Sequence, residues 1–302
     1  TEDGKTTVQI ELDYPAKTQG PVIEEMVRAK LVEAGIPADV KISQNIIAHE
    51  VQRGVKVFDS VRNIIAVSSG KGGVGKSTVS ANLALALQQE GAKVGLLDAD
   101  VYGPSQPTML GITDKPYSVD GKTLEPMIAH GLQVASVGVL IDPDQPMIWR
   151  GPLAVSALQQ LLKQTNWKDL DYLIVDMPPG TGDIQLSLSQ EVPLTGAVVV
   201  TTPQDIALMD ARKGLVMFEK VNVPILGIIE NMATHICSKC GHEEHIFGEG
   251  GAAKMAAQYG VDLLGELPLD INIRLSMDKG EPIVISEPDS KVAQAYRDIA
   301  RK

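Results

Sequence analysis

The chain has very little cysteine: only Cys237 and Cys240 carry a thiol among its 302 residues. Two cysteines cannot build the disulfide framework of a small secreted domain. In an intracellular chain, a C-x-x-C spacing indicates metal binding or redox chemistry instead. The length and the 44% hydrophobic content allow a large core without cross-links. We therefore expect one large domain together with a small one.

Long apolar runs and an excess of positive charge are also missing. No run approaches the ~20 apolar residues that cross a bilayer, and the polar residues 1–5 do not resemble a signal peptide. Thr1, in place of an initiator methionine, indicates a cropped or processed N-terminus. The 38 acidic and 27 basic residues give a net charge of −11, which argues against sequence-independent binding of DNA or RNA. We expect a cytoplasmic protein with no nucleic-acid and no membrane partner.

The glycine-rich stretch from Gly70 to Thr78 is the strongest positive signal. It matches G-x-x-x-x-G-K-[ST] between a strand-like apolar run and a helix-like run, which is the setting that this motif requires. Glycines let backbone N–H groups turn toward phosphate oxygens, and the helix N-terminus adds positive partial charge. Lys76 is predicted to reach the β- and γ-phosphates, and the Ser77 hydroxyl to ligate Mg²⁺. The predicted nucleotide-binding loop comprises Gly70, Lys71, Gly72, Gly73, Val74, Gly75, Lys76, Ser77 and Thr78.

From Ile64 onward, apolar strand-like runs alternate with helix-like runs. This alternation predicts an α/β fold of the P-loop NTPase type, with a mostly parallel, doubly wound sheet and helices on both faces. The runs are apolar throughout, as in strands that are buried on both faces. The Gly- and Pro-rich segment 114–145 reads as an insertion without a clear place in the sheet. The expected strands span 64–67, 93–98, 171–176, 196–201, 224–230 and 261–267, and a closing helix spans 290–302.

The N-terminal residues have a different pattern. Alternating apolar residues predict a strand at 8–12, an amphipathic pattern predicts a helix at 22–34, and a second short strand is expected at 40–43. We expect a small α+β domain over residues 1–50, a linker over residues 51–61, and the P-loop domain over residues 62–302.

Polar residues follow four of the expected strands: Ser68–Ser69, Asp98, Asp176 and Asn231. In a doubly wound sheet the carboxyl ends of the strands meet at the ligand crevice. Asp176 ends an apolar run, as a Walker B acid does, and is expected to hold Mg²⁺ through water. Asp98 and Asp100 are expected to divide two tasks, one facing the metal and the other orienting the attacking water. Asp100 is assigned to the water because it lies farther along the loop.

Both cysteines lie in a histidine-rich loop over residues 235–245. Two thiolates are half of the four cysteines that a typical iron–sulfur cluster takes. Ligand chemistry leaves three options open. A homodimer could share a cluster across its two-fold axis, or one chain could bind zinc by adding two of its histidines. A redox disulfide is the third option, although the strand and helix context for it is absent. The candidate histidines are His235, His242 and His245.

Taken together, the motifs resemble the Mrp/ApbC family of iron–sulfur cluster carriers, which are MinD-like ATPases with a deviant Walker A motif. The resemblance covers about residues 62–300, and residues 1–50 resemble the small domain that often precedes them. It implies slow ATP hydrolysis, a homodimer, a labile [4Fe–4S] cluster on paired C-x-x-C loops, and delivery to apoproteins alongside cluster-assembly proteins. The motifs are S-S-G-K-G-G-V-G-K-S-T, L-D-A-D-V-Y-G-P-S, W-R-G-P (149–152), D-M-P-P-G-T-G-D, T-T-P-Q-D-I-A-L, E-N-M and C-S-K-C.

Position by position, the resemblance implies that Cys237 and Cys240 ligate the cluster and that Asn231 contacts adenine. It also implies that Lys71 acts in trans on the nucleotide of a partner chain. Two other functions stay open: a MinD/ParA-type positioning ATPase with a zinc-binding C-x-x-C loop, and a reductase like the nitrogenase iron protein, whose cysteines lie far apart. Residues 290–302 carry both charge signs and few large apolar side chains, which favours a packed helix over a membrane-binding one.

Overall fold

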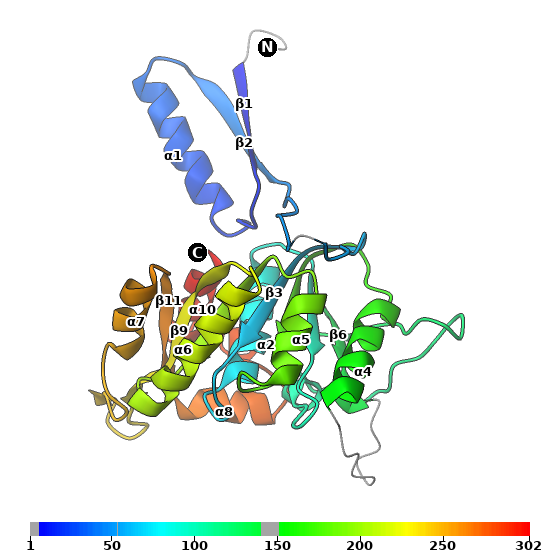
Figure 1. Cartoon of the computed structure of the whole chain (residues 1–302). Coiled ribbons are helices and arrows are strands. Elements are labelled where there is room, and N and C mark those ends of the chain that lie inside the picture. Colours follow the sequence, from blue (N-terminus) through cyan, green and yellow to red (C-terminus); the bar gives the residue numbers. More distant parts are fainter. Residues whose placement is uncertain (1–5, 53, 140–150) are drawn as a thin grey trace.

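The computed structural model describes residues 6–52, 54–139 and 151–302. Residues 1–5 and the Trp149–Arg150 part of the W-R-G-P motif lie outside this range. The described P-loop region contains one nine-stranded sheet in the order β10-β9-β8-β3-β7-β4-β6-β5, with β11 paired to β9 (Figure 1). The strands are β3 (Val61–Ser68), β4 (Val94–Asp98), β5 (Met127–Ala129), β6 (Leu132–Ser136), β7 (Leu170–Asp176), β8 (Gly196–Thr201), β9 (Ile225–Ile236), β10 (Glu243–Glu244) and β11 (Leu263–Leu269).

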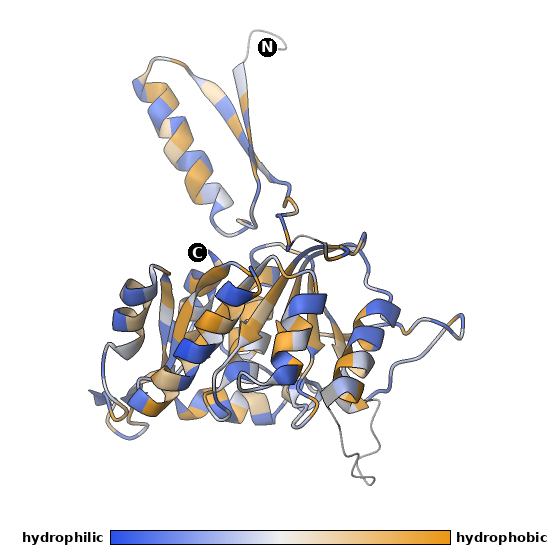
Figure 2. Ribbon diagram, in the orientation of Figure 1, coloured by the Kyte–Doolittle hydropathy of each residue, from blue (hydrophilic) through white to orange (hydrophobic). Residues whose placement is uncertain are grey.

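Helices cover both faces of this sheet, as predicted. Alternate residues of β3 point to opposite sides, so Ala66 and Val67 belong to different buried apolar clusters. Leu158 of α4 and Leu215 of α6 pack into the first cluster, and Leu85 of α2 packs into the second. Figure 2 shows the strands as apolar ribbons between helices with polar outer faces. The helices are α2 (Lys76–Gln89), α3 (Gln106–Met109), α4 (Gly151–Gln164), α5 (Asp183–Glu191), α6 (Asp205–Lys220), α7 (Gly251–Tyr259), α8 (Ile271–Asp278), α9 (Ile283–Ser286) and α10 (Lys291–Ala300).

Two predictions about the sheet need correction. The segment 114–145 is not merely an insertion, because it supplies β5 and β6, and β6 pairs in parallel with β4 inside the sheet. Asn231 does not end its strand, because β9 continues through Ile236 by pairing with β11 and then with β10. In both cases pairing with a distant segment of the chain extends the sheet beyond the local apolar pattern.

The N-terminal elements are β1 (Thr6–Leu12), α1 (Gly20–Glu33) and β2 (Ala38–Gln44), and the two strands pair in parallel. They contact the P-loop region through Glu90, which is fully buried just after α2. The Glu90 carboxylate accepts hydrogen bonds from the Thr18 backbone and hydroxyl, and the Arg301 guanidinium donates to it over 2.8 Å. Because α2 begins at the P-loop, this contact lies at the opposite end of the domain (Figure 1). The division into domains at residues 50 and 62 remains a prediction.

Candidate nucleotide site and cysteine hairpin

The loop between β3 and α2 has the backbone geometry of a phosphate-binding loop. Gly73 and Gly75 have φ values of +82° and +83°, which favour glycine, and Gly75 caps α2. Gly70 packs so closely on α6 that an added Cβ would lie 2.1 Å from the Asp210 carbonyl carbon. Among the described residues, none accepts a hydrogen bond from the backbone N–H groups of residues 70–75. These donors are therefore available to phosphate oxygens at the start of a helix.

A buried cluster of polar side chains lies directly behind this loop. The Lys76 ammonium donates to Asp176 Oδ1 over 2.6 Å, and the Ser80 hydroxyl donates to the same oxygen over 2.8 Å. Lys76 Nζ also lies 3.2 Å from the Ser77 hydroxyl and 4.0 Å from Asp100 Oδ2. The structure thus brings Lys76, Ser77, Asp100 and Asp176 together, although they are spread over 100 residues of the chain. Their catalytic roles stay predictions.

Asp98 and Asp100 occupy different surroundings in this cluster. Asp98 is fully buried, and its Oδ2 accepts hydrogen bonds from the Ser105 and Gln106 backbone and from the Ser136 hydroxyl. Burial, followed by the negative charge of Asp176, raises the pKa of Asp98 to about 7. Burial also raises the pKa of Asp100, and this effect is opposed by the positive charge of Lys76. Among the described residues, Asp100 forms an ion pair with Lys76 and Asp98 does not, and the division of tasks between the two aspartates stays a prediction.

Gln106 belongs to this site, but the sequence patterns do not point to it. Its amide donates to Asp176 Oδ2 and to the Ser77 carbonyl, each over 2.9 Å. Its Oε1 is buried and has no hydrogen-bond partner among the described residues. Buried acceptors are normally satisfied, so a water molecule on Mg²⁺ would suit this atom. The oxygen-rich set of Ser77, Asp176 and Gln106 therefore fits Mg²⁺. No local motif could have identified Gln106, because its partners are distant in sequence.

Asn231 and Lys71 are the two remaining predicted nucleotide residues. Asn231 is buried and donates to the Val74 carbonyl over 2.8 Å, so it holds the P-loop from behind. Lys71 is exposed, and it forms no ion pair with the part of the chain that the structure describes. Contact of Asn231 with adenine and action of Lys71 on a partner's nucleotide stay predictions.

The two cysteines lie in a turn at the end of β9. The Gly241 backbone donates to the Cys237 carbonyl over 2.8 Å, and the Cys237 backbone donates to the His242 carbonyl over 2.9 Å. We call residues 237–242 the cysteine hairpin. Both thiols are free, and Cys240 is exposed. Hydrogen bonds from the backbone N–H groups of Lys239 and Cys240 lower the pKa of Cys237, which favours the thiolate that binds metal.

Within the described ranges, no three His, Cys, Asp or Glu side chains converge to hold a metal ion. His245 Nδ1 donates to the Ala233 carbonyl over 2.9 Å, and His235 Nδ1 lies 3.3 Å from Glu244. These contacts use only the Nδ1 atoms, and a histidine that binds metal through Nε2 commonly makes such a contact, so zinc within one chain stays an alternative. The cysteine hairpin offers two thiolates, which is half of a cluster's usual set.

A family model described as "ParA: NUBPL iron-transfer P-loop NTPase" matches residues 60–302. The chain belongs to this family. Its membership places the chain among P-loop proteins that bind and hydrolyse nucleoside triphosphates. The small N-terminal elements lie outside the matched range.

Proteins that are similar to this chain carry names that agree with this family. An "Iron-sulfur cluster carrier protein" of Salmonella typhimurium is 56% identical, over 97% of this chain and 81% of that protein. The mouse "Iron-sulfur cluster transfer protein NUBPL" is 51% identical, over 81% of this chain and 77% of its own length. A nucleotide-binding protein from Archaeoglobus fulgidus, solved with ADP, has a TM-score of 0.68 and 37% identity, covering 78% of this chain and 92% of its own. The MinD ATPase of Pyrococcus furiosus is more distant, with a TM-score of 0.60, 26% identity, and coverage of 79% and 97%.

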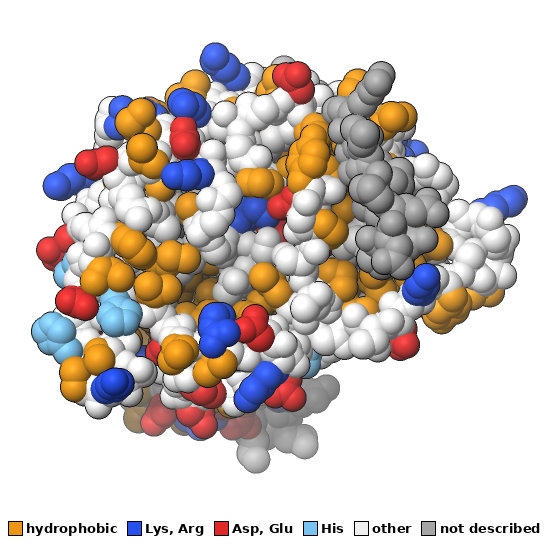
Figure 3. Space-filling view, turned by 90° about the horizontal axis from the view of Figure 1, so that it is seen from below, with side chains coloured by type: hydrophobic (Ala, Val, Ile, Leu, Met, Phe, Trp, Pro, Cys, Tyr) orange, Lys and Arg blue, Asp and Glu red, His pale blue; other side chains and the backbone are white. Residues whose placement is uncertain are grey.

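In this family member, exposed apolar side chains gather at the carboxyl ends of the strands, on the face of the molecule that carries the P-loop. Figure 3 looks onto this face and shows apolar groups around a hollow that holds charged side chains. Ile206 and Met209 at the start of α6 are 59% and 56% exposed, and Ile246, which follows the hairpin, is 47% exposed. Such a concentration is typical of an interaction surface. No described helix has the length and apolar character that crossing a bilayer requires.

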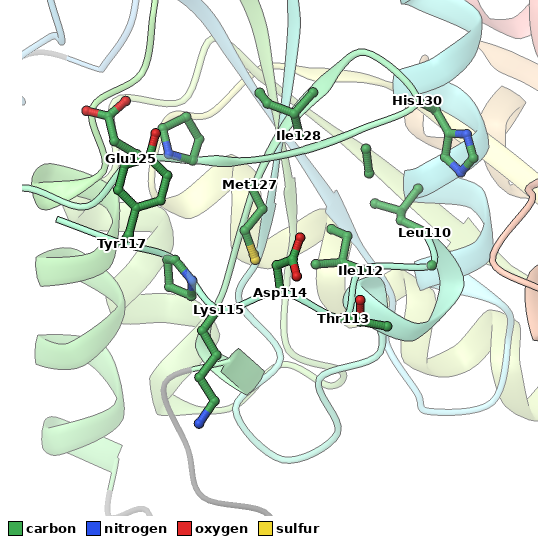
Figure 4. A pocket seen from close by; sticks show the side chains of 14 residues that line it. Leu110, Ile112, Thr113, Asp114, Lys115, Tyr117, Glu125, Met127, Ile128 and His130 are labelled. Carbon is green, nitrogen blue, oxygen red and sulfur yellow. The ribbon is translucent and has the colours of Figure 1, made fainter. Parts of the chain in front are cut away.

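A separate cavity of about 650 Å³ lies beside β5, at one edge of the sheet. Figure 4 shows Asp114 and Met127 pointing toward one another across it, with Tyr117 and His130 at opposite sides. None of its lining residues belongs to the P-loop or to the cysteine hairpin. It therefore plays no part in the site described above.

The raised pKa of Asp98 predicts that the nucleotide-free protein becomes less stable as the pH rises. Between its ordinary pKa of 3.8 and about 7, the folded chain keeps a proton that the unfolded chain loses. The free energy of unfolding should therefore fall across this window, and Asp98→Asn should remove about 2–4 kcal/mol of the fall. Urea unfolding of both proteins at pH 5 and at pH 7.5 checks this. Equal pH dependence in the two proteins would contradict it.

Proposed function

We propose that this protein is an ATP-dependent carrier of iron–sulfur clusters. The observation that carries the proposal is the pair of free thiols, half-buried Cys237 and exposed Cys240, which follows β9 at the carboxyl ends of the strands, where the P-loop also lies. The names of relatives more than 50% identical to this chain support it. The cluster is cargo in this proposal, held by the thiolates and passed to apoproteins with the help of cluster-assembly proteins.

The cluster is a [4Fe–4S] cluster at a homodimer interface. Two cysteine hairpins related by a two-fold axis supply the four thiolates that such a cluster takes. The exposed side chains of Ile206, Met209 and Ile246 lie on the face that carries the P-loop. They support self-association, because burying them removes apolar surface from water. One chain alone would leave half of the coordination positions unfilled.

ATP binds at the P-loop, where Lys76 would hold the phosphates, the Ser77 hydroxyl would ligate Mg²⁺, and Asp176 and Gln106 would hold the ion through water. When bound, Mg²⁺ neutralises charge that develops on the phosphates. Asp100 orients the attacking water, and Lys71 reaches the nucleotide of the partner chain. Hydrolysis by water requires the protein to position the reacting groups and does not require a covalent intermediate on the protein, so these groups suffice for a slow ATPase.

Nucleotide and cluster act on each other through the dimer. ATP can change cluster retention only if it binds the loading and releasing forms of the dimer with different affinity. Residues 1–50 form a separate small domain in this proposal, joined by residues 51–61 to the carrier domain over residues 62–302. The small domain contacts the carrier domain at Glu90, opposite the P-loop, and so leaves the face that carries the P-loop open to a second chain.

Anaerobic reconstitution tests the proposal directly. Iron, sulfide and molecular mass are measured on the same sample, with and without Mg-ATP. We expect a dimer with about four iron and four sulfide per two chains. A strictly monomeric protein that binds zinc at its cysteines under reducing, nucleotide-saturated conditions would contradict the proposal and favour a MinD/ParA-type ATPase.

A further inference from the structure

One short segment separates the P-loop contact from the cysteine hairpin. Asn231, which holds the Val74 carbonyl, and Cys237 are six positions apart on β9 and its continuation. A strand in regular extended conformation would join them rigidly. The segment between them is not regular.

β9 bulges immediately after Asn231. Leu267 of β11 pairs with Asn231 and Leu269 pairs with His235, so residues 232–234 of β9 lie opposite Pro268 alone. Pro268 has no backbone N–H and cannot complete the ladder at this point. The bulge over residues 232–234 therefore has a cause in each strand: extra residues in β9 and a proline in β11.

Met232 takes a left-handed conformation within this bulge, with φ of +58°. For a residue other than glycine this costs about 1–2 kcal/mol and persists only where the surroundings impose it. An extended backbone would be intrinsically favoured for Met232, so the surrounding contacts hold it against this preference. A backbone held in this way is suited to switching between two conformations.

Contacts on each side of the bulge hold it in place. On the nucleotide side, Met232 reaches the P-loop, because a Cβ added to Gly75 would lie 3.8 Å from Met232 Cε. On the hairpin side, the Ala233 carbonyl accepts from His245 Nδ1 over 2.9 Å. Just upstream, Glu230 is anchored by the Ala252 backbone N–H of α7 over 2.7 Å. The bulge therefore contacts the P-loop on one side and the segment directly after the hairpin on the other.

We propose that the bulge over residues 232–234, with Met232 as its positioning residue, couples the P-loop to the cysteine hairpin. Nucleotide at the P-loop alters the contacts of Asn231 and Met232, the Met232 backbone changes conformation, and Cys237 and Cys240 are reoriented. This inference rests on the proposed function for its biological meaning. By linkage, a cluster on the cysteines changes nucleotide affinity by the factor with which nucleotide changes cluster affinity.

Hydrogen exchange on the reduced, cluster-free protein tests the coupling. With saturating Mg-ADP, we expect exchange at the hairpin amides of residues 237–242 to change by at least about fivefold in the wild type. In Met232→Gly the left-handed conformation carries no penalty, so we expect a change of less than about twofold. Met232→Ile, whose branched side chain disfavours φ > 0, should also lose the response, with altered exchange already present before nucleotide is added.

Asn222→Gly is the matched control, because Asn222 is another left-handed residue, with φ of +57°, in the turn after α6. It should respond to Mg-ADP as the wild type does. A wild-type hairpin that ignores Mg-ADP, or a Met232→Gly hairpin that responds fully, overturns the inference. Because no cluster is present, failure of the carrier function would appear only in reconstitution and would leave this result standing.

Discussion

Replacing either Cys237 or Cys240 with serine is expected to abolish cluster binding. Each substitution removes two of the four thiolates from the proposed homodimer, because the change occurs once in each chain. After anaerobic reconstitution, iron and sulfide should fall from about two of each per chain to background. Both side chains lie in a surface hairpin, so the free energy of unfolding should change by no more than about 0.5 kcal/mol.

Two control variants separate a shared cluster from zinc bound within one chain. Ser238→Ala lies in the same turn and should keep the full content of iron and sulfide. The double variant His235→Ala/His242→Ala leaves only His245, so one chain cannot complete a tetrahedral zinc site. We expect this double variant to bind the cluster normally. If the wild type binds no cluster and the histidine variant loses its bound metal, the result would support zinc bound within one chain.

Substitution of the two P-loop lysines is expected to separate binding from hydrolysis. Lys76 is buried against Asp176, and Lys76→Ala should abolish Mg-ATP binding because the main phosphate partner is lost. Lys71 is exposed on its own chain. Lys71→Ala should lower the hydrolysis rate about a thousandfold, as loss of a cationic group supplied in trans does, with a much smaller effect on Mg-ADP affinity. Fluorescent nucleotide titration and phosphate release measure the two effects.

Mixing two inactive variants tests whether Lys71 acts in trans. In a heterodimer of Lys71→Ala and Asp100→Asn chains, the first chain keeps its Asp100 and receives Lys71 from its partner. With random exchange of subunits, activity should recover to about a quarter of wild type. Lys213→Ala, which removes an exposed lysine of α6, is the surface-charge control and should keep wild-type activity. A mixture that stays inactive while subunits exchange would place Lys71 in its own chain's site.

The sequence alone indicated the P-loop, the α/β class and the cysteine pair because each is a local pattern. The predicted binding of nucleotide by Gly70–Thr78 depends on glycine dihedral freedom and on a strand before and a helix after the loop, all within a short stretch. Continuous apolar runs identified β4, β7 and β8. The family resemblance drawn from these motifs is confirmed by the match over residues 60–302.

Tertiary structure decided the features that depend on contacts between distant residues. Gln106 became part of the site by meeting Asp176, 70 residues away, and β6 entered the sheet by pairing with β4. The extension of β9 depends on β11, and the left-handed Met232 depends on a bulge opposite Pro268. Sequence patterns report the preferences of neighbouring residues. Packing sets which distant groups meet, how deeply Asp98 is buried and where the backbone is held against its own preference.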